Sequence, residues 1–227
     1  MTKSQPDFDF MVKSARPLPR EFYARDPRRV ACELLGKVLV RRERRRLLAG
    51  RIVELEAYLG TRDPAAHAFS GPTARNLVLF GPPGHAYVYF IYGNHYCLNV
   101  TCEPEGRAGC VLFRALEPIA GLEQMFRARG LLVPHRQRSA GAAAQQFSLT
   151  DLRSLASGPG RLSQALGITR ARDNGKDLTR FSDLAILDDG FRPRRILTTP
   201  RIGITKAAHE KLRYLVAGNP FVSGKRR

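Results

Sequence analysis

The sequence contains no long hydrophobic run. No stretch approaches the roughly 18 uninterrupted apolar residues that a membrane-spanning helix needs. The amino-terminal segment MTKSQPDFDF carries acidic residues and lacks the apolar centre of a secretory signal peptide. We therefore expect a soluble, cytoplasmic protein that has no membrane partner.

Cysteine is also scarce. The four cysteines do not show the paired two-residue spacing that zinc sites use. Because disulfides are uncommon in a reducing cytosol, we expect free and buried thiols, and we predict neither a metal site nor a disulfide scaffold. These residues are Cys32, Cys97, Cys102 and Cys110.

Negative charge is the third shortage. The 227 residues include 20 Asp and Glu against 38 Lys and Arg, so the formal net charge is +18. Only seven of the basic residues are Lys, and the other 31 are Arg. Codon bias in a GC-rich genome explains this much arginine as well as selection for binding does. In either case the positive field attracts polyanions, nucleic acid first among them, because Arg contacts phosphate at two points and stacks on bases.

The remaining composition is that of an ordinary globular domain, with 43% hydrophobic and 26% charged residues. We interpret residues 1–15 as a flexible amino-terminal arm, because they lack periodic hydrophobicity, and residues 16–224 as a single domain. The small and polar segment at about 134–148, which contains SAGAAAQQ, predicts a surface loop inserted into that domain.

A helix and two strands are predicted near the start of the domain. Asp26 before Pro27 is typical of a helix start, and we expect this helix to end at Gly36. Hydrophobicity then alternates with a period of two over 38–41 and 48–59, which predicts two strands joined by a basic turn.

The second of these strands carries a candidate site. Alternation places Val53, Leu55, Ala57 and Leu59 on a face that we predict to be core, and it places Ile52, Glu54, Glu56 and Tyr58 on the other face. A half-exposed strand often presents Glu and Tyr to solvent. However, acidic residues are scarce in this chain and a carboxylate near DNA is repelled by phosphate, which favours a chemical role for the two carboxylates.

A hairpin is predicted around the Gly-Asn pair at 93–94. Two runs rich in aromatic and branched residues flank this two-residue turn signal, which would place Tyr92 opposite His95. A tyrosine at a hairpin tip is either an exposed side chain or a wedge that enters a base stack. Behind the tip, alternation places Tyr87 and Tyr89 on one face.

Three further features are open to two interpretations. A lone loop histidine such as His67 is usually solvated. Arg114 lies inside an apolar strand, where a guanidinium needs an anionic partner, and Glu56 is one candidate. A helix is predicted to begin at Pro159 with Arg161 in its first turn, and such a start can bind phosphate, although most bind only water.

Six sequence strings occur in order along the chain: EAYLG at 56–60, DPAAHAFSG at 63–71, GPPGHAYVYFIYGNHYCLN at 81–99, GCVLFRALEP at 109–118, SGPGRLSQALGI at 157–168 and PRIGI at 200–204. They span nearly the whole chain after residue 20. Together they resemble the alkyladenine (3-methyladenine) DNA glycosylase family, and this resemblance is far more specific than any single motif.

The resemblance implies an enzyme that acts on double-stranded DNA and hydrolyses the N-glycosidic bond of alkylated or deaminated purines, such as 3-methyladenine, 7-methylguanine, hypoxanthine and ethenoadenine. The family uses no metal or cofactor. Together with the patterns above, the resemblance implies an α+β domain with a central, largely antiparallel sheet, a protruding hairpin and peripheral helices. It also implies a monomer without an obligate protein partner, associated with the nucleoid in a bacterium.

Carried over position by position, the resemblance implies that Glu56 is the general base that activates water against the anomeric carbon of the sugar. Arg114 and the main-chain carbonyl of Ile202 would help to hold that water. His67 would hydrogen-bond near the glycosidic bond, which makes it a third catalytic side chain. No Lys lies in the pocket motifs, so a Schiff base is not expected, and we predict a monofunctional enzyme that leaves an abasic site.

The resemblance also implies an aromatic clamp around a purine that is flipped out of the duplex. Tyr58 would stack on one face of the base, and His67 and Tyr89 on the other, which favours electron-poor alkylated purines. Asn99 would lie against the purine edge and clash with the exocyclic amine of normal guanine.

The remaining implied roles concern the duplex. Tyr92 would enter through the minor groove and fill the gap left in the stack, with Asn94 and His95 beside it at the hairpin tip. Relatives usually carry an apolar residue where this chain has Asn94, which leaves the packing of the tip open. The matched positions that line the DNA backbone are Thr73, Arg75 and Arg161.

Two other interpretations stay open. The chain could be a noncatalytic, Arg-rich duplex- or RNA-binding relative that keeps the wedge and the positive field but has lost turnover. It could also be a small-molecule acyl or formyl transferase on a similar scaffold, to which the arginine excess gives little support. The fold alone does not separate these functions.

Overall fold

The computed structural model describes residues 16–43, 46–91, 93–134 and 147–224. The predicted arm 1–15, Tyr92 and most of the predicted 134–148 loop lie outside these ranges. The helices are α2 (Arg20–Tyr23), α3 (Pro27–Leu34), α4 (Leu122–Ala128), α5 (Leu149–Ala156), α6 (Pro159–Ala165) and α7 (Arg170–Asp173), with the 3-10 helices η1 (Gly60–Arg62) and η2 (Leu77–Phe80). The strands are β1 (Val38–Glu43), β2 (Arg46–Tyr58), β3 (Ala86–Ile91), β4 (His95–Cys102), β5 (Gly109–Ala120), β6 (Leu184–Leu187), β7 (Ile196–Thr199) and β8 (Arg213–Val216).

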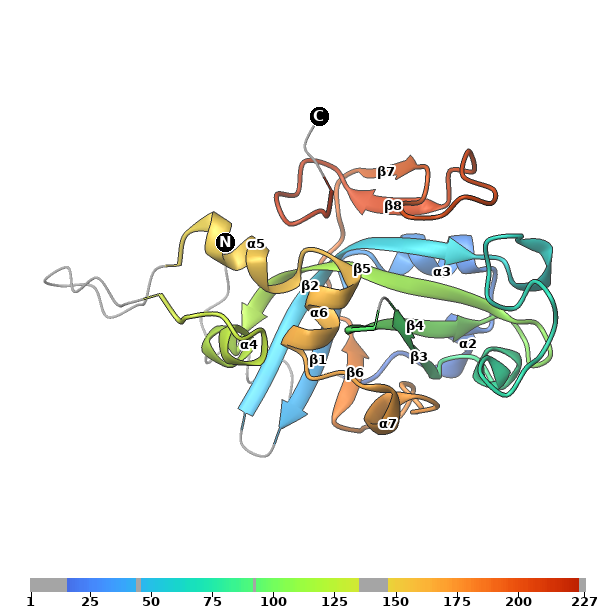
Figure 1. Ribbon diagram of the computed structural model, residues 1–227, viewed down its shortest axis with the longest axis horizontal. Helices are drawn as coiled ribbons and strands as arrows, with labels where there is room; N and C mark the ends of the chain where they lie inside the picture. The colour runs from blue at the N-terminus through green and yellow to red at the C-terminus, as the bar shows by residue number, and fades with distance from the viewer. Residues whose placement is uncertain (1–15, 44–45, 92, 135–146, 225–227) are drawn as a thin grey trace, which may run out of the picture.

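The strands form one antiparallel sheet in the order β3-β4-β5-β2-β1-β6. The long strand β2 pairs with β5 along one edge, and along the other edge it pairs first with β1 and then with β8, which also pairs with β7. Figure 1 shows α4 and α5 to the left of the sheet, α6 near the centre of the view, and the β7–β8 hairpin and α7 on opposite sides. The predicted α+β class, with a largely antiparallel sheet and peripheral helices, is confirmed.

The helix predicted after Asp26 is α3. The Asp26 side chain accepts a hydrogen bond from the Arg28 N–H at 2.9 Å, and Pro27 occupies the first turn, as the sequence predicts. The helix stops before Gly36, whose φ of +88° is strained for any residue with a side chain. A Cβ at Gly36 would also lie 2.9 Å from the Phe191 ring, so the helix end and the following strand stay close to the 188–196 segment.

The prediction that Val53 shares a face of β2 with Leu55, and that Ile52 lies on the opposite face, is wrong. The register between β2 and β5 shifts next to Val53, and the shift breaks the alternation of side chains. Ile52 therefore packs in the same core cluster as Leu55, while Val53 packs in a separate cluster. The shift lies where β2 exchanges its neighbour β1 for β8, and this second neighbour leaves Glu54 and Glu56 fully buried.

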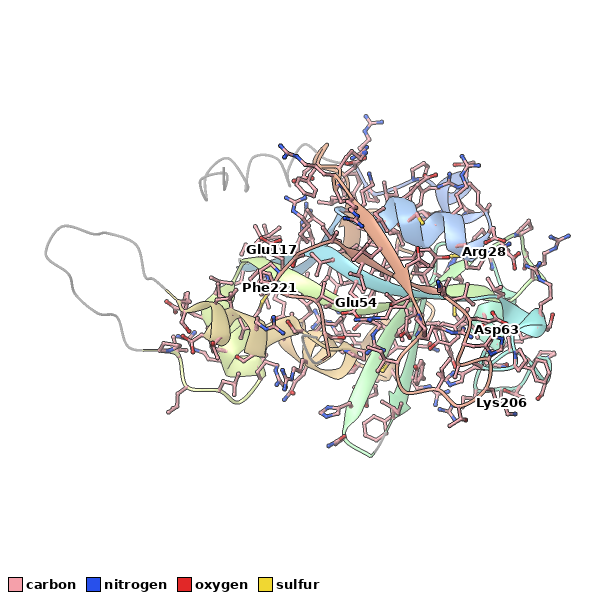
Figure 2. The ribbon with its side chains drawn as sticks, turned by 90° about the horizontal axis from the view of Figure 1, so that it is seen from above. Arg28, Glu54, Asp63, Glu117, Lys206 and Phe221 are labelled. Carbon is pink, nitrogen blue, oxygen red and sulfur yellow. The ribbon has the colours of Figure 1, made fainter. Side chains whose placement is uncertain are left out.

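The predicted hairpin is formed by β3 and β4, and Figure 2 shows it projecting from the body of the molecule. Its register differs from the prediction, because Ile91 lies opposite His95 and three residues rather than two connect the strands. The predicted pairing of His95 with Tyr92 is therefore wrong. A two-residue turn of the predicted type needs positive φ at both central positions, whereas Gly93 has a φ of +70° and Asn94 does not share this conformation.

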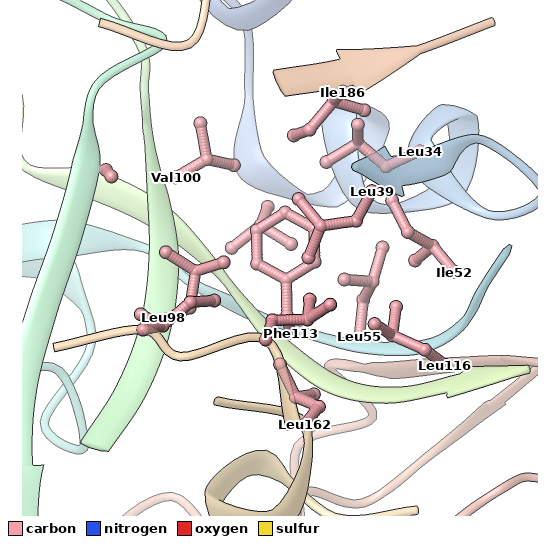
Figure 3. Packing of buried hydrophobic residues seen from close by; sticks show 14 of the residues in the cluster. Leu34, Leu39, Ile52, Leu55, Leu98, Val100, Phe113, Leu116, Leu162 and Ile186 are labelled. Carbon is pink, nitrogen blue, oxygen red and sulfur yellow. The ribbon is translucent and has the colours of Figure 1, made fainter. Parts of the chain in front are cut away.

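The main core is built around Phe113 on β5. Figure 3 shows its ring at the centre of the cluster, among side chains from β1, β2, β4 and α6 that include Leu39, Leu55, Leu98 and Leu162. Complete burial of a side chain of this kind stabilises the fold by about 1.5–3 kcal/mol. Since successive residues of a strand face opposite ways, this packing directs the neighbours of Phe113 toward the other side of the sheet.

The four cysteines are free, and all but the half-buried Cys32 are buried, which confirms the prediction of free thiols. No helix in the described part of the chain is long and apolar enough to cross a membrane. Among the described residues, no group of three His, Cys, Asp or Glu side chains is arranged so that it could hold a metal ion.

Candidate active site

A cavity of about 360 Å³ opens between the β3–β4 hairpin and the loop that joins β7 to β8. One face of the sheet forms its floor, because three strands contribute side chains at alternate positions. These are Tyr87, Tyr89 and Ile91 on β3, Cys97 and Asn99 on β4, and Cys110, Leu112 and Arg114 on β5. The walls come from other elements and include Tyr58 at the end of β2, His67 in the loop after η1, Pro159 of α6 and Ile202.

The carboxylate of Glu56 lies directly behind this lining and is fully buried. Its Oε1 accepts a hydrogen bond from the Ile202 N–H at 2.8 Å and lies 3.2 Å from Nη1 of Arg114. Its Oε2 accepts a hydrogen bond from the Tyr58 hydroxyl at 3.0 Å. The anionic partner predicted for Arg114 is therefore present. Three donors from three separate elements hold the carboxylate in place behind Tyr58, Arg114 and Ile202, which line the cavity.

Aromatic rings stand on the cavity walls. The rings of His67 and Tyr89 lie 4.4 Å apart between centroids, and Nδ1 of His67 is 3.0 Å from the hydroxyl of Tyr87. Burial, followed by the charge of Arg75, lowers the pKa of His67, so the ring is neutral at pH 7. Burial, followed by the charge of Glu56, raises the pKa of Tyr58 above its usual range, so its hydroxyl stays protonated and donates.

Asn99 lies on the floor of the cavity and is held rigidly. Its Nδ2 donates to the main-chain oxygen of Tyr87 at 3.1 Å, and the Cys110 thiol lies 3.9 Å from its Oδ1. Only 2% of the residue is exposed. Its polar edge therefore has one orientation, and an atom that enters the cavity meets a fixed amide rather than an adaptable one.

Sequence reasoning missed the extent of the charged cluster behind Arg114. Glu54 is fully buried and accepts hydrogen bonds from Nε of Arg114 at 2.9 Å and from Nε of Arg213 at 2.7 Å. Burial lowers the pKa of Arg114, but the charges of Glu56 and Glu54 outweigh it and raise that pKa. The only sequence signal was the pair of carboxylates two positions apart on one strand.

A second buried pair was missed altogether. The carboxylate of Asp63 accepts hydrogen bonds from both terminal nitrogens of Arg201, and both side chains are fully buried. The Arg201 guanidinium lies over the ring of Tyr58, 4.6 Å from its centroid. This pair therefore supports the cavity wall from behind. Both residues stand in the quoted strings DPAAHAFSG and PRIGI, but no spacing rule pairs residues so far apart in sequence.

Of the residues predicted to touch DNA, Tyr92 lies outside the described part of the chain, and Asn94 and His95 lie at the tip of the β3–β4 hairpin. The side chains of Thr73, Arg75, Asn94 and Arg161 are exposed. His95 is half-buried and packs against α6, where a Cβ added at Gly160 would lie 2.9 Å from its ring. The structure thus brings seven predicted residues together in or directly behind the cavity lining, namely Glu56, Tyr58, His67, Tyr89, Asn99, Arg114 and Ile202. The lining does not include Thr73, Arg75, Asn94, His95 or Arg161.

Comparison with known proteins gives one consistent result. The family model described as Methylpurine-DNA glycosylase matches residues 21–220. A protein of Koribacter versatilis is 63% identical over 211 residues, which cover 92% of this chain and 94% of the relative. Proteins of Burkholderia cenocepacia and Methanoculleus marisnigri are each 48% identical, over 209 and 210 residues, and cover 91% of this chain and 91% and 98% of their own length. All three carry the name "Putative 3-methyladenine DNA glycosylase".

Proposed function

The chain belongs to the methylpurine-DNA glycosylase family, and from this premise we propose that it removes damaged purines from duplex DNA by hydrolysing the N-glycosidic bond. The proposed substrates are 3-methyladenine, 7-methylguanine, hypoxanthine and ethenoadenine. The names of the relatives support the first of these. The formal charge of +18 supports a polyanionic partner.

The proposal begins with extrusion of the purine, because a base inside the duplex cannot reach a buried carboxylate. Tyr92, which lies outside the described residues, is the proposed wedge that fills the gap. The extruded base would stack between Tyr58 and the pair His67 and Tyr89, which contributes about 1–3 kcal/mol per stacked base. A cationic alkylpurine gains further from the electron-rich ring faces. The rigid amide of Asn99 supports the exclusion of guanine, whose exocyclic amine would clash with it.

Hydrolysis then replaces the bond between the sugar and the purine nitrogen with a bond between the sugar and a water oxygen. Glu56 would take the proton of the attacking water and stabilise the oxocarbenium-like centre. Arg114 and the carbonyl of Ile202 would hold the water, and neutral His67 would hydrogen-bond near the breaking bond. The described residues that line the cavity include no lysine, which supports release of the purine without a Schiff base and without strand cleavage.

The observation that carries the proposal is the Glu56 carboxylate, held by three donors directly behind the lining of an aromatic cavity. The test is release of free hypoxanthine and 3-methyladenine from duplex oligonucleotides by the wild type, by Glu56→Gln and by a control, Glu123→Gln. Glu123 lies on α4, is partly exposed and, among the described residues, forms an ion pair with Arg127. Removal of a general base is expected to slow release by about 100-fold or more, while the control matches the wild type.

Equal activity of Glu56→Gln and the wild type would refute the role of this carboxylate. Tight binding of an abasic-site analogue by a wild type that releases no base would instead favour the noncatalytic, Arg-rich DNA-binding alternative. Retained binding by Glu56→Gln serves as the check on folding, since the substitution leaves the aromatic walls and the arginines in place.

A further inference from the structure

Glu54 has no part in the proposed chemistry, although it is as buried as Glu56 and stands two residues before it on β2. Figure 2 shows Glu54 in the interior of the molecule. A carboxylate without exposure is costly unless its charge is paired and its oxygens are hydrogen-bonded. A second such group beside the proposed base therefore calls for a reason.

Both oxygens of Glu54 accept hydrogen bonds. Oε1 accepts hydrogen bonds from Nε of Arg114 at 2.9 Å, from Nε of Arg213 at 2.7 Å and from the Ser223 hydroxyl at 2.9 Å. Oε2 accepts a hydrogen bond from the Ser223 main-chain N–H. Glu54 is fully buried with four donors around it and does not line the cavity. Its contacts point to a different task, which is to hold its donors.

Arg114 is the donor that connects this cluster with the proposed chemistry. Its Nε bonds to Glu54, its Nη1 lies 3.2 Å from Glu56, and its Nη2 donates to the hydroxyl of Ser223 at 3.4 Å. The guanidinium is planar, so the bonds of Nε to Glu54 and of Nη2 to Ser223 fix the direction in which Nη1 points. We propose that Glu54 and Ser223 are positioning residues that orient Arg114 toward Glu56 and toward the attacking water.

The carboxy-terminal segment is anchored well enough for this task. The Ser157 hydroxyl donates to the main-chain oxygen of Phe221 at 2.7 Å, and Asn219 donates to Glu117 at 3.0 Å. The Phe221 ring is buried against Val53 and Ala115. The packing of Phe221 on β2 and β5 therefore fixes the position of Ser223, which contacts Glu54 and Arg114.

This inference rests on the proposed function and has a consequence that a purely structural role lacks. A positioning residue acts through Arg114 alone. Substitution of a positioning residue should slow the chemical step without weakening DNA binding. The same substitution should have no further effect in a variant whose Arg114 is already replaced. A residue that merely supports the fold would lower both quantities and would act independently of Arg114.

The experiment compares Ser223→Ala with Ser157→Ala, which removes one hydroxyl that holds the same segment but does not touch Glu54. Single-turnover purine release and affinity for an abasic-site duplex are measured for both variants. Ser223→Ala is expected to slow release about tenfold, since small misplacements of a catalytic group have effects of this size or larger. Its affinity, and both properties of Ser157→Ala, are expected to stay within about twofold of the wild type.

The second arm repeats Ser223→Ala in an Arg114→Lys background, in which the charge remains but the separate guanidinium contacts to Glu54 and Ser223 are lost. There the serine substitution is expected to change release by less than about twofold. Glu54→Gln, which removes the charge but keeps the shape, is expected to slow release at least as much as Ser223→Ala, and its melting temperature shows whether it folds.

Equal slowing by Ser223→Ala and Ser157→Ala, or an undiminished effect of Ser223→Ala in the Arg114→Lys background, overturns the positioning role. These outcomes leave the proposed function intact, because the wild type still releases purines in the same assay. A wild type that releases no purine refutes the proposed function, and the inference with it. The two failures are thus distinguished by one control reaction.

Discussion

The hydroxyl of Tyr58 donates a hydrogen bond to Glu56 across 3.0 Å, so one wall of the cavity is tied directly to the carboxylate. The two residues stand two positions apart on β2 and point to the same side. Burial and the charge of Glu56 raise the pKa of Tyr58, so its hydroxyl is protonated and can donate at neutral pH. The ring and the hydroxyl of Tyr58 therefore have separable functions.

Tyr58→Phe should separate these functions. The substitution keeps the stacking ring and removes only the bond to Glu56, and a hydrogen bond to a charged group is worth about 1.5–3 kcal/mol. We expect purine release to slow about tenfold in a single-turnover assay, with unchanged affinity for lesion-containing duplex. Tyr58→Ala should lower the affinity as well, because it also removes the stacking surface. Weaker binding by Tyr58→Phe would contradict this division of roles.

The buried pair of Arg201 and Asp63 should matter mainly for stability. Arg201→Met leaves the Asp63 charge buried without its partner and is expected to destabilise the fold by about 3–5 kcal/mol in urea unfolding. The matched control is Arg29→Met, since Arg29 forms an exposed pair with Glu33, and it should cost less than about 0.5 kcal/mol. Adding Asp63→Asn to Arg201→Met should recover most of the loss. A double variant as unstable as Arg201→Met would show that packing, rather than the uncompensated charge, sets the cost.

Alternation along β3 was enough to predict that Tyr87 and Tyr89 share a face. Both side chains lie on the cavity floor, and Val88 between them packs in the core, as a period of two requires. The same rule failed on β2 at Val53, where the register with β5 shifts next to the point at which β8, a strand far later in the chain, begins to pair with β2. The alternation of residues therefore predicts the faces of a strand reliably only where the strand keeps the same neighbour along each edge.

Long-range ion pairs could not be predicted for a related reason. Arg114 signalled that it needed an anion, and Glu56 was named, but Glu54 shares the charge and was not. The partner serine of Glu54 stands at position 223, near the other end of the chain. Which carboxylate meets which guanidinium depends on how β8 and the carboxy-terminal segment return to β2, and hydrophobic periodicity carries no information about that path.

The exposed arginines Arg75 and Arg161 should contribute to the affinity for DNA without changing the rate of purine release. Arg75→Ala and Arg161→Ala each remove one exposed charge at a predicted backbone contact. Each variant should weaken binding equally for damaged and undamaged duplex and should reduce the slope of log affinity against log salt by about 1. Purine release at saturating enzyme should not change. Arg29→Ala is the control, because Figure 2 shows α3 on the side of the molecule away from the β3–β4 hairpin. A lesion-dependent loss of affinity would contradict a backbone role.

The carboxylate of Asp183 should make stability depend on pH in the acid range. It accepts hydrogen bonds from Arg41, Arg172 and Lys176. Burial alone would raise the pKa of Asp183, but these contacts outweigh it and lower the pKa from 3.8 to about 2. Because the folded state holds the proton less tightly than the unfolded chain does, the stabilisation is complete above about pH 4 and is lost as the pH falls toward 2.

The pH-dependent part of the free energy of unfolding follows from the lowered pKa of Asp183. It is smaller than the full pKa change implies, because about a third of the Asp183 side chain is exposed and solvent partly screens its ion pairs. We expect the wild type to exceed Asp183→Asn in free energy of unfolding by about 1 kcal/mol more at pH 5 than at pH 2. Urea unfolding of both proteins across this range measures the difference. A difference in free energy of unfolding that stays constant with pH would show that Asp183 stabilises the fold through its shape and not through its charge, since only the contribution of the charge is lost when the carboxylate is protonated.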